Sequence, residues 1–270
     1  MSPYSPEELE KLVQAICASP KYAQIAPSLV ERIAAEELAK RGDTWSALKA
    51  ARTRLHQVTG AFLAPDMNYA KWEDILKSIP LENPQELQAF CQRMMRLHNS
   101  TAERLPYLEQ FFSTCLADIS PISSVLDLAC GLNPLALPWM PLAPTCAYSA
   151  CDVVQPMLDF LNQFFAFSGV QGSAFPCDLS ACVPEHKVQL AILLKTLPCL
   201  DQLDKTLGSR LLANLNTEHI LVSYPAKSLG GREKGMRLTY RQQFARLIEG
   251  TSFHVREFDF PNELAFLLSR

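Results

Sequence analysis

The stretch SSVLDLACGLNPLALPWM, residues 123–140, decides the fold of this chain. It opens with a short apolar run that contains one acid, Asp127, and it then turns at Gly131 into a segment compatible with a helix. A near-continuous apolar run of this length is typical of a strand that is buried on both faces of a parallel sheet. The stretch therefore predicts a strand over 123–130, a tight turn, and a helix near 134–140, which together begin an α/β sheet.

Further apolar segments follow at regular intervals and alternate with helical patterns. The predicted strands are 147–154, 172–179, 188–197 and 219–225, and the predicted helices are 156–167, 201–214 and 237–249. The last two strands, 252–260 and 263–270, are separated by a short turn only, which predicts a final hairpin. This layout resembles the seven-stranded Rossmann-like sheet of S-adenosylmethionine (SAM) dependent methyltransferases, mostly parallel with an antiparallel last strand. We therefore predict an α/β fold, with residues 119–270 as a SAM-binding domain.

The first 118 residues show helical periodicity and frequent prolines, without a convincing strand. Ser5-Pro6 places a capping residue and a proline at the start of the first helix, and Pro27-Ser28 starts another. Further helical patterns lie at 44–63, 69–78, 84–97 and 100–117. We therefore predict that residues 1–118 form an all-α domain.

Charged side chains stand where the predicted strands end. Asp127, Asp152 and Asp178 close the first three strands, and Lys195 closes the fourth. Ligands of open parallel sheets bind beyond these carboxyl ends. Gly131 stands alone where a dinucleotide-binding turn needs several glycines, so a diphosphate ligand is disfavoured. Acids that merely stabilise turns are the alternative interpretation.

The overall composition is that of a globular protein, with 48% hydrophobic residues and a formal net charge of -3. The nine cysteines are scattered, and the pairs Cys146/Cys151 and Cys177/Cys182 enclose four residues each. Zinc sites usually enclose two, so we expect no metal and a reduced, cytoplasmic protein. No apolar stretch approaches the length that crosses a membrane.

Four segments carry a resemblance to one enzyme family. They are HNSTAERL (98–105), LDLACGLNPLALPWM (126–140), LLKTLPCLDQ (193–202) and SYPAKSLGGREKGM (223–236). In this order they resemble the aminoglycoside-resistance 16S rRNA (guanine-N7) methyltransferases. The resemblance implies methylation of guanosine 1405 (rRNA numbering) in the decoding site of the 30S subunit, with SAM as cofactor. It also implies resistance to 4,6-disubstituted deoxystreptamine aminoglycosides. We expect a monomer that docks on the 30S subunit through residues 1–118.

The resemblance also assigns cofactor-binding residues. Arg104 matches the family's arginine that reaches the carboxylate of SAM, and a planar guanidinium suits this task. Asp127, Ala129 and Gly131 belong to the turn against the cofactor. Asp152 would bind the ribose hydroxyls, and Asp178 with Leu179 would contact the adenine. Ala129 and Asn133 stand where many methyltransferases have glycines. An Arg104 that lies on a solvated helix face beside Glu103 is the alternative.

No general base is needed for the implied reaction, because N7 of guanine carries a lone pair and no proton at neutral pH. Positioning then supplies most of the rate. The five histidines show no catalytic spacing. Lys195, Tyr224, Ser228 and Met236 are predicted contacts of the pocket or of the loop that follows the fifth strand.

Two segments are locally basic although the chain is acidic overall. Residues 40–56 carry a formal charge of +4, and residues 227–246 carry +5. Such patches suit the phosphates of folded RNA. The predicted RNA-binding residues are Lys21, Lys49, Arg52, Arg54, Lys227, Arg232, Lys234 and Arg237. A solvated helix face is the alternative. Two other functions stay open, a methyltransferase for a small molecule with a helical lid and a ribosome-binding module without activity.

Overall fold

The computed structural model describes residues 4–59, 67–80, 82–226 and 235–270. Within these residues, seven strands form one sheet in the order β3-β2-β1-β4-β5-β7-β6. The strands are β1 (Ile122–Leu128), β2 (Leu142–Asp152), β3 (Gln171–Pro176), β4 (Val188–Leu194), β5 (Thr217–Pro225), β6 (His254–Phe260) and β7 (Glu263–Ser269). Neighbours from β1 to β5 run parallel, and β7 is antiparallel to β5 and β6. The predicted sheet of SAM-dependent methyltransferases is confirmed.

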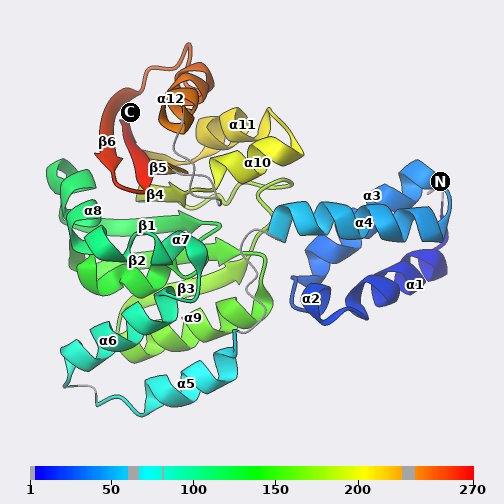
Figure 1. The fold of residues 1–270 in the computed structure, drawn as a ribbon, viewed down its shortest axis with the longest axis horizontal. Coiled ribbons are helices and arrows are strands. Elements are labelled where there is room, and N and C mark those ends of the chain that lie inside the picture. The colour runs from blue at the N-terminus through cyan, green and yellow to red at the C-terminus, as the bar shows by residue number, and fades with distance from the viewer. Residues whose placement is uncertain (1–3, 60–66, 81, 227–234) are drawn as a thin grey trace.

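Helices cover both faces of this sheet (Figure 1). They are α9 (Gln155–Ser168), α10 (Leu197–Leu203), α11 (Leu207–Asn214) and α12 (Met236–Leu247), and a 3-10 helix, η3 (Asn133–Trp139), follows β1. Val125 packs in the core that contains the phenylalanines of α9, whereas its neighbour Leu126 packs in the core that contains α11. This alternation explains why the strands are apolar on both faces. The predicted helix over 201–214 is two helices, with a break at residues 204–206.

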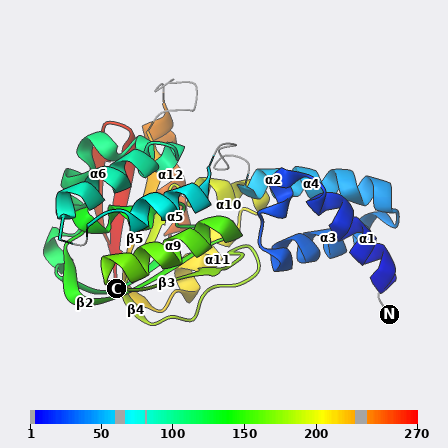
Figure 2. The same ribbon diagram turned by 90° about the horizontal axis from the view of Figure 1, so that it is seen from below.

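The first helices form a lobe beside the sheet, seen at the right of Figures 1 and 2. They are α1 (Pro6–Cys17), α2 (Pro20–Ala23), α3 (Pro27–Arg41) and α4 (Thr44–Thr59). Ser5 and Glu8 form the capping box that starts α1. The lobe has a hydrophobic core of its own, from Leu12 to Leu55.

The next helices belong to the core of the sheet. They are α5 (Tyr69–Lys77), α6 (Pro84–Met95), α7 (Asn99–Ala102) and α8 (Leu108–Cys115), with 3-10 turns η1 (Leu105–Tyr107) and η2 (Ala117–Ile119). Trp72 of α5 meets Phe160 of α9 edge-on, with ring centroids 5.4 Å apart. The separate helical core therefore ends near residue 55, well before the predicted boundary at 118. The helix predicted over 100–117 is interrupted at Leu105-Pro106, where proline breaks the hydrogen-bond ladder.

Backbone contacts fasten the lobe to the sheet beside the end of β2. The amide of Ala26 donates to the carbonyl of Val153 at 2.8 Å, and the amide of Gln155 donates to the carbonyl of Gln24 at 2.9 Å. These bonds fix the start of α3 against the loop between β2 and α9. Among the described residues, no helix is long and apolar enough to cross a membrane.

Candidate functional site

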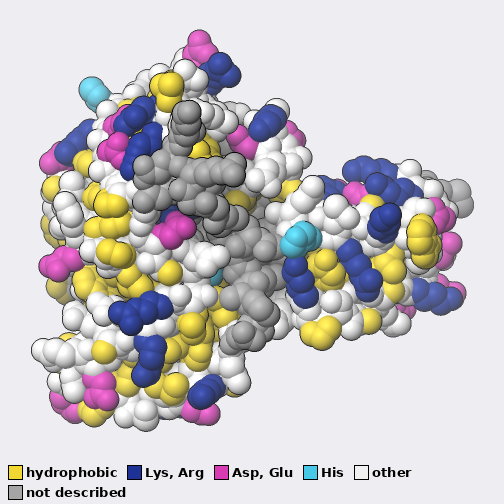
Figure 3. Space-filling model, viewed as in Figure 1, with side chains coloured by type: hydrophobic (Ala, Val, Ile, Leu, Met, Phe, Trp, Pro, Cys, Tyr) yellow, Lys and Arg dark blue, Asp and Glu magenta, His cyan; other side chains and the backbone are white. Residues whose placement is uncertain are grey.

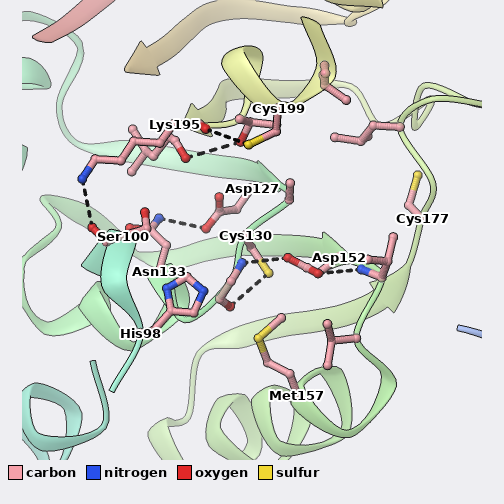
Figure 4. Close-up of a pocket in the computed structure, with 18 of the residues that line it drawn as sticks. His98, Ser100, Asp127, Cys130, Asn133, Asp152, Met157, Cys177, Lys195 and Cys199 are labelled. Carbon is pink, nitrogen blue, oxygen red and sulfur yellow. Dashed lines mark hydrogen bonds between the residues drawn. The ribbon is translucent and has the colours of Figure 1, made fainter. Parts of the chain in front are cut away.

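A cavity opens at the carboxyl ends of the central strands (Figure 4). The strand order reverses between β1 and β4, and ligands of open α/β sheets bind at such a switch point. The predicted residues that line it are Arg104, Asp127, Ala129, Gly131, Asp152, Asp178, Leu179 and Lys195. The fold thus brings together residues that are up to 91 positions apart, and the sequence order alone does not show this proximity.

Asp127 lies buried at the end of β1 and holds the turn that follows. Its Oδ2 atom accepts from Nδ2 of Asn133 at 2.9 Å and from the hydroxyl of Tyr148 at 2.7 Å. Burial raises the pKa of Asp127 to about 7, although these two hydrogen bonds and Arg104 act in the opposite direction. Asp127 therefore titrates near neutral pH, which makes it sensitive to a cation placed in the cavity.

The turn after β1 contains two residues in the left-handed region. Ala129 has φ of 49° and Gly131 has φ of 51°. At Gly131, an added Cβ would lie 2.8 Å from Cε1 of the buried His98 ring. The turn therefore requires glycine at 131, both for its backbone conformation and for its space. Ala129 adopts a glycine-like conformation without being glycine.

We expect opposite effects from substitutions at these two positions. Gly131→Ala should lower the free energy of unfolding by about 1–2 kcal/mol through the left-handed backbone alone, with the His98 contact added. Ala129→Gly should raise it by about 1 kcal/mol, since the strain is relieved. Urea unfolding of both variants measures the two effects. Shifts of the same sign would contradict this explanation.

Asp152 stands at the end of β2 with its carboxylate fixed by backbone amides. The amide of Gly131 donates to Oδ2 at 2.9 Å, and the amide of Val153 donates to Oδ1 at 2.6 Å. Burial raises its pKa above the ordinary value, whereas the backbone hydrogen bonds lower it. The carboxylate is thereby aimed and held at the cavity wall.

Asp178 follows β3 and is joined to the N-terminal lobe. Arg32 of α3 forms an ion pair with Oδ2 of Asp178 and also donates to Oγ of Ser180 at 2.8 Å. Ser180 donates to the other oxygen, Oδ1, from its amide at 3.0 Å and its hydroxyl at 2.6 Å. Arg32 was missed by the sequence reasoning, because nothing in α3 marks a partner 146 positions away.

Arg104 is buried in a double hydrogen bond with Glu263. Its Nε and Nη2 atoms donate to the two carboxylate oxygens at 2.9 and 2.6 Å, and Nη1 donates to Oδ1 of Asn133 at 3.2 Å. The alternative of a solvated Arg104 beside Glu103 is therefore wrong. Glu263, the first residue of β7, is fully buried and was not predicted.

Lys195 completes this charged cluster from the end of β4. Its Nζ atom lies 2.5 Å from Oε2 of Glu103 and 4.0 Å from Oε2 of Glu263. Lys195 also has φ of 59°, so its backbone is strained where the side chain enters the cavity wall. Two acids thus face two basic groups beneath the pocket.

The remaining predicted pocket contacts are placed differently. Tyr224 lies in an aromatic cluster on the other face of the sheet, 4.9 Å from Tyr240 between ring centroids. This placement contradicts a pocket role for Tyr224, because the alternation of β5 directs it toward α12. Met236 begins α12 and does not line the cavity, and Ser228 lies outside the described residues. Within the described ranges, no group of His, Cys, Asp or Glu side chains is arranged to hold a metal ion.

A second surface lies on the N-terminal lobe, where Lys and Arg side chains gather along α3 and α4 (Figure 3). A shallow groove there is lined by residues from three helices, namely Glu37, Lys40, Arg41, Trp45, Ser46, Lys49, Ala50, Thr53, Arg54, Gln57, Gln202 and Leu203. Its acid, Glu37, forms ion pairs with Lys40, Arg41 and Arg54. Trp45 is 75% exposed within this basic groove and was not predicted. An exposed ring between cations suits the bases and phosphates of RNA. We call this surface the α4 groove.

The predicted RNA-binding residues differ in exposure and in the contacts that they make. Lys49 is exposed in the α4 groove, whereas Arg54 pairs with Glu36. Arg52 donates to the carbonyl of Ala15 at 2.7 Å and so ties α4 to α1. Lys21 lies 2.7 Å from Nδ1 of His56, and Arg237 donates to the carbonyl of Phe260 at 2.9 Å. The other three, Lys227, Arg232 and Lys234, lie outside the described residues.

Comparisons with known proteins match this chain to ribosomal RNA methyltransferases. A family model described as ribosomal RNA methyltransferase (FmrO) matches residues 18–267. The 16S rRNA (guanine(1405)-N(7))-methyltransferase of Micromonospora echinospora is 34% identical over 274 residues, and the alignment covers 100% of both chains. The enzyme of that name from Serratia marcescens is 33% identical over 85% of each chain.

Solved structures extend the likeness to three dimensions. The 16S rRNA methyltransferase RmtF, crystallised with S-adenosyl-L-homocysteine, superposes with a TM-score of 0.84 at 30% identity, covering 99% of this chain and 100% of that one. An rRNA methylase from Escherichia coli gives a TM-score of 0.78 at 28% identity, with 97% and 99% covered. The chain therefore belongs to the FmrO family of ribosomal RNA methyltransferases.

Proposed function

We propose that this protein transfers the methyl group of SAM to N7 of guanosine 1405 in 16S rRNA, within the decoding site of the 30S subunit. The observation that carries the proposal is the cavity at the switch point, where three strand-end acids and Arg104 meet. The family relationship supports the same substrate, since the relatives carry this activity in their names. We propose that the protein acts in the cytoplasm as a monomer.

The cavity residues fit the chemical groups of SAM. The cofactor combines a carboxylate, an ammonium, a sulfonium, a ribose and an adenine, and it carries no phosphate. Arg104 offers N–H groups to the carboxylate, and Asp127 faces the cationic end. Asp152 is fixed for the ribose hydroxyls, and Asp178 with the apolar Leu179 serves the adenine. Ala129 and Gly131 give the backbone close access to the ligand.

When bound, SAM supplies an activated methyl group, and the protein supplies the geometry. N7 of guanine has no proton to remove, so no side chain has to act as a base. His98 lines the cavity, and burial lowers its pKa to about 4, so this ring is neutral at pH 7. The base must leave the RNA stack to reach the methyl group. Positioning of the two reactants then accounts for the rate.

We propose that the α4 groove holds the rRNA backbone while the base enters the cavity. Lys49 and the exposed Trp45 present a charge and an aromatic face on the same lobe, beside Arg41, which pairs with Glu37. A methyl group on N7 removes a hydrogen-bond acceptor from the major groove and leaves a positive charge on the ring. Polycationic 4,6-disubstituted deoxystreptamine aminoglycosides are thereby repelled, and we propose that the enzyme confers resistance to them. Neomycin-type and apramycin-type drugs should be little affected.

Cofactor binding should depend on pH through Asp127. Its pKa of about 7 means that the free protein holds this carboxyl largely protonated at pH 6 and ionised at pH 8. The ammonium of the ligand favours the ionised form, so affinity should rise with pH, by up to about 10-fold over this interval. Calorimetric titration with S-adenosyl-L-homocysteine tests this, with Asp127→Asn expected to flatten the profile. A wild-type profile that falls with pH would contradict the assignment of Asp127.

One experiment tests the proposed function directly. The protein is incubated with labelled SAM and with intact 30S subunits, naked 16S rRNA or 50S subunits, and the label is mapped by primer extension. Label at guanosine 1405 on 30S subunits alone is the expected result, and no label on any RNA would overturn the proposal. Binding of S-adenosyl-L-homocysteine without RNA labelling would favour a small-molecule methyltransferase. Absence of both S-adenosyl-L-homocysteine binding and RNA labelling would favour a ribosome-binding module without activity.

A further inference from the structure

The loop that follows β3 brings two cysteine thiols together at the edge of the cavity. The Sγ atoms of Cys177 and Cys182 lie 3.4 Å apart, and both residues are free thiols. Cys177 lines the cavity, and Figure 4 shows its side chain on this loop. Cys182 is exposed to solvent and does not line the cavity. One thiol of the pair therefore faces the cavity, and the other is accessible from solvent.

The local backbone explains why these two residues meet. The amides of Ala181 and Cys182 donate to the carbonyl of Asp178 at 2.9 and 3.0 Å, which folds the chain back on itself. Cys177 is anchored as well, since its amide donates to the carbonyl of Asp152 at 3.0 Å. A disulfide needs a sulfur separation near 2.05 Å, so the two thiols have to approach by about 1.4 Å. Because the backbone of Cys177 is anchored, the side chains of both residues have to supply this movement.

The two thiols also differ in reactivity. Hydrogen bonds from the thiols of Cys151 and Cys182 lower the pKa of Cys177 to about 7, although burial acts in the opposite direction. Burial raises the pKa of Cys199, another thiol of the cavity, to about 11. The thiolate is the reactive form of cysteine, so Cys177 is the nucleophile of this site. Cys182, whose pKa is raised to about 11, is the second thiol.

We propose that Cys177 and Cys182 form a thiol modification site on the cofactor pocket, which a peroxide converts to a disulfide. The thiol of Cys177 first loses its proton to solvent, and the thiolate attacks the peroxide: an S–O bond forms, the O–O bond breaks, and the leaving alkoxide or hydroxide takes up a proton from solvent to give an alcohol or water. The sulfur of Cys182 then attacks the sulfenic acid, an S–S bond forms, the S–O bond breaks, and water leaves with the proton of Cys182. The two thiols lose two electrons in total, and the peroxide gains them.

The disulfide acts on the adenine end of the pocket. Residues 177–180 all line the cavity, and the new bond draws the Cys177 sulfur toward Cys182. Asp178 is the next residue and is already held by Arg32 and Ser180, so it cannot follow freely. We expect the affinity for S-adenosyl-L-homocysteine to fall about 10-fold on oxidation and to return with dithiothreitol. Bound ligand, in turn, should shield Cys177 from the peroxide.

The test uses the full chain and hydrogen peroxide. Remaining thiols are blocked with a maleimide, the disulfide is mapped by peptide mass, and ligand affinity is measured calorimetrically before and after oxidation. The expected result is a Cys177–Cys182 bond with a reversible loss of affinity. Unpaired thiols after oxidation, a bond between Cys177 and Cys151, or equal affinity of the oxidised and reduced protein would overturn the proposal.

Two variants sharpen the result. Cys182→Ser should bind the ligand as the wild type does when reduced, and it should accumulate a sulfenic acid at Cys177 that dimedone traps. Cys17→Ser, in α1 of the N-terminal lobe, is the matched control and should behave as the wild type throughout. The affinity effect rests on the proposed cofactor site, whereas the disulfide itself does not. Disulfide mapping and rRNA labelling are therefore independent, so failure of one is distinguishable from failure of the other.

Discussion

Replacing Arg104 with methionine should destabilise the fold and abolish cofactor binding together. The change leaves the Glu263 carboxylate, which is fully buried, without the two hydrogen bonds that it accepts from Arg104, and among the described residues only the one from Ser223 and the ion pair with Lys195 remain. Breaking such a pair from one side costs about 3–5 kcal/mol. For a chain of this size that corresponds to a fall in Tm of about 10 °C. Affinity for S-adenosyl-L-homocysteine should fall by about 100-fold or more. Thermal melting and calorimetry measure the two effects.

The double variant Arg104→Met with Glu263→Leu separates stability from binding. Replacing both members of a buried pair with apolar residues is often neutral for stability. The double variant should therefore recover most of the lost Tm and still fail to bind the cofactor. If it binds S-adenosyl-L-homocysteine with wild-type affinity, Arg104 supports the fold only and the proposed contact with the ligand is wrong.

Reversing one charge in the α4 groove should damage RNA recognition and spare the cofactor. Lys49 is exposed, and within the described residues its ammonium group has no hydrogen bond or ion pair. Lys49→Glu should lower kcat/KM on 30S subunits by about 10-fold and reduce the salt dependence of binding by about one phosphate contact. The affinity for S-adenosyl-L-homocysteine should stay unchanged. Filter binding at several salt concentrations and the labelling assay measure both quantities.

The matched control for this reversal is Lys77→Glu, since Lys77 is exposed on α5, away from the groove. It should leave 30S methylation as it is, and equal losses at Lys49 and Lys77 would point to a general charge effect instead. Arg52 is a poorer choice than its neighbour, because its guanidinium holds the carbonyl of Ala15. A substitution there changes the packing of α1 against α4 as well as the surface charge.

The sheet was predictable because its signals are local. The apolar runs, the turn at Gly131 and the short final hairpin each depend on neighbouring residues, and the observed strands lie within a few positions of the expected ones. The strand-end acids were predictable for the same reason, since parallel strands end at one edge. The division of the helices between the N-terminal lobe and the core of the sheet was not predictable. Periodicity shows that a helix has an apolar face, but it does not show against which core that face packs.

The partners of the site residues required the structure. Arg104 and Glu263 are 159 positions apart, and neither stands in a pattern that names the other. The same is true of Arg32 and Asp178. Tyr224 does not line the cavity because the alternation of β5 directs it to the face that α12 covers, and the sequence of the strand does not show which face α12 covers. Long-range pairing of charges therefore sets the limit of what the sequence shows here, although the residue types at the strand ends are correct.

The ion pair between Arg32 and Asp178 has a thermodynamic consequence. Arg32 also pairs with Glu36, and Glu36 pairs with Arg54 in the α4 groove, so one chain of ion pairs connects Asp178 in the cavity wall with the surface for which we propose RNA binding. We expect a phosphate bound by Arg54 to weaken the Arg54–Glu36 ion pair and thereby to alter the contacts of Arg32 with Glu36 and Asp178. Coupling between two sites is reciprocal, so we expect that any change in cofactor affinity caused by the ribosome is matched by an equal change in ribosome affinity caused by the cofactor. A cofactor affinity measured on the free protein would then differ from the affinity of the protein bound to the ribosome.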